Sequence, residues 1–206
     1  MRPNSPYWNI TQSFCKELSQ WIGDRRVLEI FAGQGELCQF LSNLGVDIHA
    51  TGITNSKQMH FDVERMEACK AAYTYRDRDV LLMSWPETYI DAALAAMIFC
   101  QGRESTTEII YIGQELDTLN NILGGTATDE LFYITTLCHS FSHPSPLQGN
   151  IAQARKLHDK DTREQRLGEL NTHIKNGRVE QGLLSGHLRG QQKALEQYLM
   201  TNKNHC

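Results

Sequence analysis

The chain has 206 residues, is 40% hydrophobic and 21% charged, and carries a formal net charge of −4 at pH 7. This composition is that of an ordinary globular protein, and the apolar runs are too short to span a bilayer. No N-terminal signal peptide is apparent and the six cysteines are scattered singly, which excludes a disulfide framework and predicts a cytoplasmic protein with reduced thiols.

The first predicted element is an amphipathic helix over about residues 10–22. Apolar side chains recur along one of its faces at helical spacing, at Ile10, Phe14, Leu18, Trp21 and Ile22. Gly23 and Asp24 end this helix. It leads directly into the stretch around which the rest of the prediction is organised.

That stretch predicts a buried strand, a glycine turn and a helix. Val27 to Phe31 form a short apolar run interrupted by one glutamate, and the turn Ala-Gly-Gln-Gly follows it. Leucine and phenylalanine side chains at helical spacing then predict a helix over residues 36–44, which Gly45 ends. Glycine permits a tight turn and the close approach of a ligand, and the free N–H groups of a helix start favour a polar or anionic group. The same pattern also fits a turn without any ligand.

The motif resembles motif I of the class I S-adenosylmethionine (SAM) methyltransferases, in which an acidic residue stands four positions before G-x-G. The resemblance implies that Glu29, on the strand, helps to hold the methionine end of SAM. It also implies that Phe31, Gly33 and Gly35 belong to the turn that passes close under the cofactor. Cys38 stands where the dinucleotide fingerprint needs its third glycine, so a nicotinamide-dependent enzyme is the weaker interpretation.

The second strand is predicted over about residues 46–53, where polar and apolar residues alternate. In the methyltransferase family, an acidic residue at the end of this strand usually bonds the ribose hydroxyls of the cofactor. Gly52 aligns with that position, so the carboxylate is missing here. Asn55 or Ser56 nearby could replace it as a weaker partner; otherwise the cofactor is bound weakly or not at all.

A short third strand is predicted at about residues 60–63, followed by a helix over about residues 66–73. The resemblance places an acidic residue near the end of this strand, against the adenine edge of the cofactor, and we assign Glu64 to it. The alternative is that Asp62, Glu64 and Glu67 form the acidic first turn of the helix, where carboxylates complement the helix dipole.

The fourth strand, over about residues 79–83, runs directly into Ser84, Trp85 and Pro86. This strand end occupies the place of motif IV in the family. Ser-Trp-Pro resembles the Asn/Asp-Pro-Pro-aromatic motif of amino-group methyltransferases, although the residues do not match it. We predict that Ser84 contacts the cofactor, while Trp85 and Pro86 wall the pocket of the methyl acceptor. Alternatively, the segment is a tight turn with Trp85 in the core.

A small-residue helix over about residues 89–100 and a fifth strand over residues 108–113 continue the alternation of strands and helices. Glu115 follows at the carboxyl end of this strand and is a second candidate for the acceptor site. A helix over about residues 126–137 comes next. No fourth ligand supports a zinc site, so we predict no metal at the clustered Cys138, His139 and His143.

A segment rich in serine and proline, residues 140–146, predicts a boundary between an α/β domain (residues 1–146) and a helical, net-basic tail (residues 147–206). The tail shows no strand pattern, so we expect the antiparallel hairpin that closes the sheet in the family to be absent. Its glycines weaken an isolated helix, which predicts that the tail packs on the body, on a second copy or on another protein.

Together these elements predict a Rossmann-like α/β fold, with a parallel sheet of order 3-2-1-4-5 flanked by helices and a helical C-terminal extension. The resemblance implies a SAM-dependent methyltransferase, with S-adenosyl-L-methionine as cofactor and a small molecule or a protein as acceptor; no general base stands out. The acidic body argues against a nucleic-acid substrate. The alternative is a degenerate methyltransferase fold that acts as a binding or scaffold protein through its tail.

Overall fold

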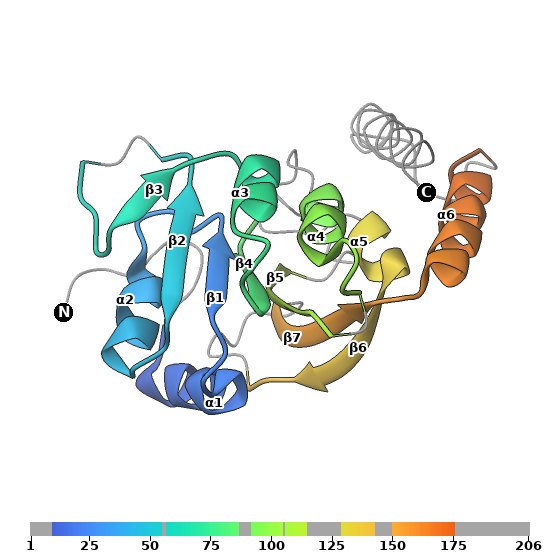
Figure 1. The fold of residues 1–206 in the computed structure, drawn as a ribbon. Coiled ribbons are helices and arrows are strands. Elements are labelled where there is room, and N and C mark those ends of the chain that lie inside the picture. Colours follow the sequence, from blue (N-terminus) through green and yellow to red (C-terminus); the bar gives the residue numbers. More distant parts are fainter. Residues whose placement is uncertain are drawn as a thin grey trace.

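The computed structural model describes six stretches of the chain: residues 10–54, 57–86, 92–104, 106–114, 129–142 and 150–175. They form a seven-stranded sheet of order β3-β2-β1-β4-β5-β7-β6 (Figure 1). The strands are β1 (Val27–Ile30), β2 (Ile48–Gly52), β3 (Val63–Arg65), β4 (Val80–Ser84), β5 (Glu108–Gln114), β6 (Thr135–Ser140) and β7 (Asn150–Leu157). The first five pair in parallel in the order 3-2-1-4-5, which confirms the predicted Rossmann-like arrangement.

Helices cover both faces of this sheet. One face carries α1 (Gln12–Ile22) and α2 (Glu36–Asn43), and the other carries α3 (Ala68–Thr74), α4 (Ala92–Cys100) and α5 (Asp129–Ile134). A strand covered on both sides needs apolar residues on both sides. This is why β4 is a continuous buried run rather than an alternating one.

The structure contradicts the expectation that the closing hairpin is absent. β6 pairs antiparallel with β7, and β7 pairs antiparallel with β5, so the parallel sheet ends in a hairpin as it does in the methyltransferase family. The boundary predicted after residue 146 therefore falls inside the sheet. The helix predicted to reach residue 137 ends at Ile134, where α5 passes directly into β6.

The hairpin escaped prediction because neither of its strands shows a clear apolar alternation. β6 lies at the edge of the sheet and exposes Thr136, Leu137 and Cys138. β7 buries the small side chains of Ala152 and Ala154 in the core on the α1 and α2 face, and alanine has a low strand propensity. Pairing with neighbouring strands, rather than local preference, makes these residues extended.

The helix that follows β7 is the described part of the predicted tail. α6 (Lys160–Lys175) contacts α5 and lies beyond the hairpin in Figure 1. Residues 176–206 lie outside the described residues, so the rest of the tail stays a prediction. Among the described helices, none combines the length and the apolar character needed to cross a bilayer.

The connection between β2 and β3 is unusual for parallel strands. Such strands normally need a crossover of about a dozen or more residues, usually a helix. The described residues between Gly52 and Val63 include no helix, and β3 begins later than predicted. The loop is held against the turn after β1, because the His60 N–H donates to the Gln34 carbonyl (2.8 Å).

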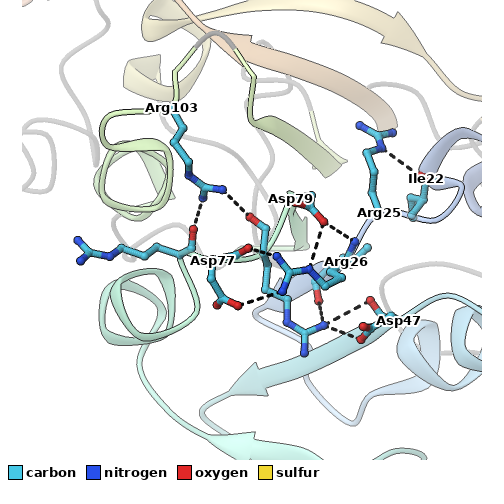
Figure 2. Close-up of polar contacts among 10 residues, drawn as sticks. Ile22, Arg25, Arg26, Asp47, Asp77, Asp79 and Arg103 are labelled. Carbon is cyan, nitrogen blue, oxygen red and sulfur yellow. Dashed lines mark hydrogen bonds and ion pairs between the residues drawn. The ribbon is translucent and has the colours of Figure 1, made fainter.

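The amino ends of the central strands are held together by the charged network in Figure 2. The Arg26 N–H donates to the Asp79 carboxylate (2.9 Å), and the Arg26 guanidinium also pairs with Asp77 (3.1 Å). Arg78 donates to Asp47 (2.7 Å), which directly precedes β2. These partly exposed pairs each contribute modestly, and together they align the strand starts at the edge opposite the glycine turn.

We expect Asp79→Asn to reduce the free energy of unfolding by roughly 0.5–1 kcal/mol at neutral pH, because the charge that binds Arg26 is lost. The backbone N–H of Arg26 is the largest cause that lowers the pKa of Asp79 below its ordinary 3.8. The stabilisation is therefore present above pH 3.8 and is lost as the pH falls through the lower pKa of the folded state. Urea unfolding of both proteins measures the difference.

The charge-matched control is Asp24→Asn, at an exposed residue after α1. An equal loss of stability in this control would show that net charge, and not the pairing of Asp79 with Arg26, causes the effect.

Candidate functional site

The two segments that the sequence singles out meet at one edge of the sheet. β1 pairs in parallel with β4, with Ile30 opposite Met83. The turn after β1 and the segment from Ser84 to Pro86 therefore lie side by side. β1 pairs with β2 on its other side, so the strand order reverses here. Open α/β sheets bind ligands outside the carboxyl ends of their strands at such a switch point.

The turn after β1 combines a left-handed backbone with open space. Phe31, Gly33 and Gly35 have φ angles of 64°, 56° and 77°. The Gly35 N–H donates to the Ala32 carbonyl (2.8 Å), and α2 begins directly afterwards without a side-chain cap. Apart from its two chain neighbours, no described residue has an atom within 4 Å of the position that a Cβ on Gly33 would occupy. Among the described residues, the turn is thus an open cradle beside the backbone N–H groups of an uncapped helix start, which suits a polar or anionic ligand group.

At Gly35, a side chain is excluded by neighbouring atoms. A Cβ at this position would lie 2.7 Å from the Cβ of Phe61 and 2.8 Å from the Cγ2 of Val63. The loop before β3 therefore packs directly on the turn. Gly35 makes room for this loop, whereas at Gly33 no described residue beyond its chain neighbours crowds the Cβ position.

Trp85 adopts the same rare backbone conformation at the end of the neighbouring strand, with φ of 53°. A left-handed backbone costs an L-residue roughly 1–2 kcal/mol, so both Phe31 and Trp85 are strained. The Trp85 backbone N–H donates to the Ile112 carbonyl of β5 (2.7 Å). The Trp85 side chain is half-buried and packs against the core, and the next residue, Pro86, is buried. Strained residues of this kind cluster at functional sites.

Glu29 lies inside the protein, close to this turn. The residue is only 1% exposed, and its carboxyl accepts hydrogen bonds from the Ser84 hydroxyl and the Cys38 thiol. Burial raises the pKa of Glu29 above its usual 4.5, and the two hydrogen bonds act in the opposite direction. The structure thus brings together two predicted cofactor residues, Glu29 and Ser84. It adds Cys38, which is not a predicted site residue. The sequence indicates only that Cys38 lies on the buried face of the helix after the turn.

The structure gives a physical reason for the missing carboxylate at Gly52. A Cβ there would lie 3.3 Å from the Ala32 nitrogen and 3.5 Å from the Gly33 nitrogen. The Ala32 N–H is bonded to the Thr51 carbonyl (3.0 Å), so the glycine turn lies directly against the end of β2. A side chain at residue 52 would therefore contact the turn tightly, and the turn would have to shift by a few tenths of an ångström to accept it.

The Glu64 carboxylate interacts with two side chains from neighbouring elements. It accepts a hydrogen bond from the Tyr75 hydroxyl (2.6 Å) and lies 2.9 Å from Nε2 of His49. These bonds, with that of Tyr75 the largest cause, lower the pKa of Glu64. Glu64 therefore links β2, β3 and the end of α3, and its contact with adenine stays a prediction. The remaining candidates lie outside the described residues: Asn55, Ser56 and Glu115.

Comparisons with known proteins find structural neighbours. No family model matches the chain, and no curated protein does. The magnesium protoporphyrin IX methyltransferase of Synechocystis with bound S-adenosylhomocysteine is similar at a TM-score of 0.47 and 8% identity, over 71% of this chain and 83% of that one. A structure described for the conversion of a disulfide bond into a thioacetal group during echinomycin biosynthesis has a TM-score of 0.49 and 10% identity, over 82% and 92%.

TrmN from Thermus thermophilus is similar at a TM-score of 0.43 and 13% identity, over 72% of this chain and 49% of that one. Identities this low do not extend to activity or substrate. The strand order and the closing hairpin are those of a methyltransferase-like Rossmann fold; the order 3-2-1-4-5 is predicted from the sequence, whereas the hairpin is expected to be absent.

We expect Gly35→Ala to destabilise the protein more than Gly33→Ala. Both variants place a side chain on a left-handed backbone, which costs roughly 1–2 kcal/mol. Only at Gly35 does the new methyl group also collide with Phe61 and Val63, and overpacking a filled site adds roughly 1–3 kcal/mol. The free energies of unfolding in urea measure the difference.

Gly45→Ala is the control for strain alone, because Gly45 has φ of 89° and open space around its Cβ position. It should match Gly33→Ala. Equal losses at Gly33 and Gly35 would contradict the packing of the loop on the turn.

Proposed function

We propose that this protein is a SAM-dependent methyltransferase that holds SAM at the Gly33 turn. The observation that carries the proposal is the open, left-handed cradle at Gly33, beside the strained turn at Trp85 across the β1–β4 pair. An open space next to strained backbone at a switch point is where α/β sheets bind their ligands.

In this proposal, each segment at the carboxyl edge of the sheet has a role. The backbone N–H groups of the turn and of the α2 start bind the methionine end of the cofactor. SAM, when bound, supplies an electrophilic methyl group. Trp85 and Pro86 wall the acceptor pocket, with Glu115 as a further acceptor contact and Glu64 at the adenine edge. Holding the acceptor atom in line with the methyl group accelerates the transfer mainly through proximity and orientation, and we assign no general base.

The proposed acceptor is a small molecule or a protein. Residues 1–146 carry a net negative charge, which would repel a phosphate backbone. Residues 147–206 carry a net positive charge and include β7 and α6. We propose that the part of this region beyond the sheet contacts a second copy of the chain or a partner protein.

One observation favours a second function, in which the fold is a scaffold that does not bind SAM. Residue 52 is a glycine in close contact with the turn, so it supplies no carboxylate to bind the ribose hydroxyls. Truncation after Leu157 separates the two functions, because it keeps β7 in the sheet and removes α6 with the rest of the tail. Retained SAM binding with loss of an oligomer or a partner would identify the tail as an interaction module.

We expect calorimetric titration of SAM and of S-adenosylhomocysteine into the full-length protein to show micromolar binding. Gly33→Ala fills the cradle with a methyl group and should weaken binding at least about tenfold. Gly45→Ala imposes a similar backbone strain away from the site and should bind like the wild type. No binding to the wild type at millimolar ligand would reject the methyltransferase and favour the scaffold.

A further inference from the structure

A buried cluster joins three elements of the site through side chains. The Glu29 carboxyl of β1 accepts hydrogen bonds from the Ser84 hydroxyl at the end of β4 and from the Cys38 thiol of α2. The three residues are 1%, 8% and 0% exposed, respectively. A buried polar group is costly unless it has partners, and here each carboxyl oxygen has one.

Each member of this cluster adjoins a backbone segment of the site. Ser84 directly precedes Trp85, Glu29 shortly precedes Phe31, and Cys38 lies in the helix that follows the glycine turn. Phe31 and Trp85 both hold left-handed conformations that L-residues rarely adopt. Such conformations persist only where the surrounding structure over-determines them. The bond between Glu29 and Ser84 joins the two strands directly before these strained residues.

We propose that Glu29, Cys38 and Ser84 form a buried latch that sets the relative position of the two turns of the site, with Cys38 and Ser84 as positioning residues. The proposal rests on the proposed function, since these turns are where SAM is proposed to bind. It departs from the family resemblance in one respect. Both carboxyl oxygens of Glu29 are bonded within the protein, so Glu29 acts through the turns and not as an exposed carboxylate that faces the cofactor.

The surroundings of the latch favour an uncharged carboxyl. Burial raises the pKa of Glu29 and also that of the Cys38 thiol that faces it. Among the described residues, the groups that act on the pKa of Glu29 are Cys38 and Ser84, and neither is cationic. No cationic group among them offsets the effect of burial, so the pKa of Glu29 is raised in the folded protein.

The first test is titration of S-adenosylhomocysteine into the full-length protein by calorimetry. Cys38→Ala and Ser84→Ala each remove one donor to Glu29, and we expect the Kd to rise at least about tenfold in both. Cys38→Ser keeps a donor of similar size and should hold the Kd within about threefold of the wild type. Equal weakening by Cys38→Ala and Cys38→Ser would overturn the positioning role.

The control for an added cavity is Cys15→Ala, because Cys15 is another buried thiol on the same face of the sheet. It should leave the Kd unchanged. A loss equal to that of Cys38→Ala would show that any cavity on this face weakens binding, and it would also overturn the positioning role.

The second test needs no ligand and separates the latch from the proposed function. A carboxyl with a raised folded pKa stabilises the fold fully below its unfolded value, near 4.5, and this contribution is lost as the pH rises through the folded pKa. We therefore expect the Tm of the wild type to fall relative to that of Glu29→Gln as the pH rises from 4.5. A difference in Tm that does not change with pH would overturn the latch.

The two tests can fail separately. Absence of S-adenosylhomocysteine binding to the wild type would reject the proposed function, while the expected pH dependence of Tm would still support the latch as the link between the two turns. Binding of the ligand together with a pH-independent Tm difference would support the proposed function and overturn the latch.

Discussion

The parallel pairing of β1 with β4 is the constraint on which the rest of the structure depends. Parallel strands align their carboxyl ends, so this pair places the turn at Phe31 beside Trp85 although they are far apart in the sequence. Both strands are buried on both faces and flanked by further strands, so a shift of register would disrupt the close packing of both cores. The open cradle at Gly33 and the buried carboxyl of Glu29 take their geometry from this pair.

The two edges of the sheet have opposite physical roles. At the amino edge, Arg26 and Arg78 pair with aspartates next to the strand starts and hold them in line. At the carboxyl edge, Phe31 and Trp85 keep strained backbones, and no described residue other than its chain neighbours crowds the Cβ position of Gly33. Strain at one edge persists because the other edge, the two-sided core and the hydrogen bonds between strands leave the chain no relaxed alternative.

Close packing of the glycine turn explains both the likeness to methyltransferases and the departure from them. The turn lies against the end of β2 at Gly52 and against the loop before β3 at Gly35, so a side chain would collide with its neighbours at Gly35 and would fit only tightly at Gly52. The position that carries the ribose carboxylate in the resembled family is thus a glycine packed closely on the turn. A ligand at this edge would gain its affinity from the backbone of the turn and the start of α2, and not from a carboxylate at residue 52.

The sequence by itself determined the central strands, the glycine turn and the helices beside them, because apolar periodicity and glycine placement are local properties of the chain. The first five strands and the candidates Glu29, Gly33 and Ser84 followed from that pattern and from the family resemblance. Only the tertiary structure decided the closing hairpin, since β6 and β7 become strands through pairing rather than through their own propensity. It also decided that Glu29 meets Cys38 and that Gly52 packs closely on the glycine turn, because contacts between residues distant in the sequence leave no local signal.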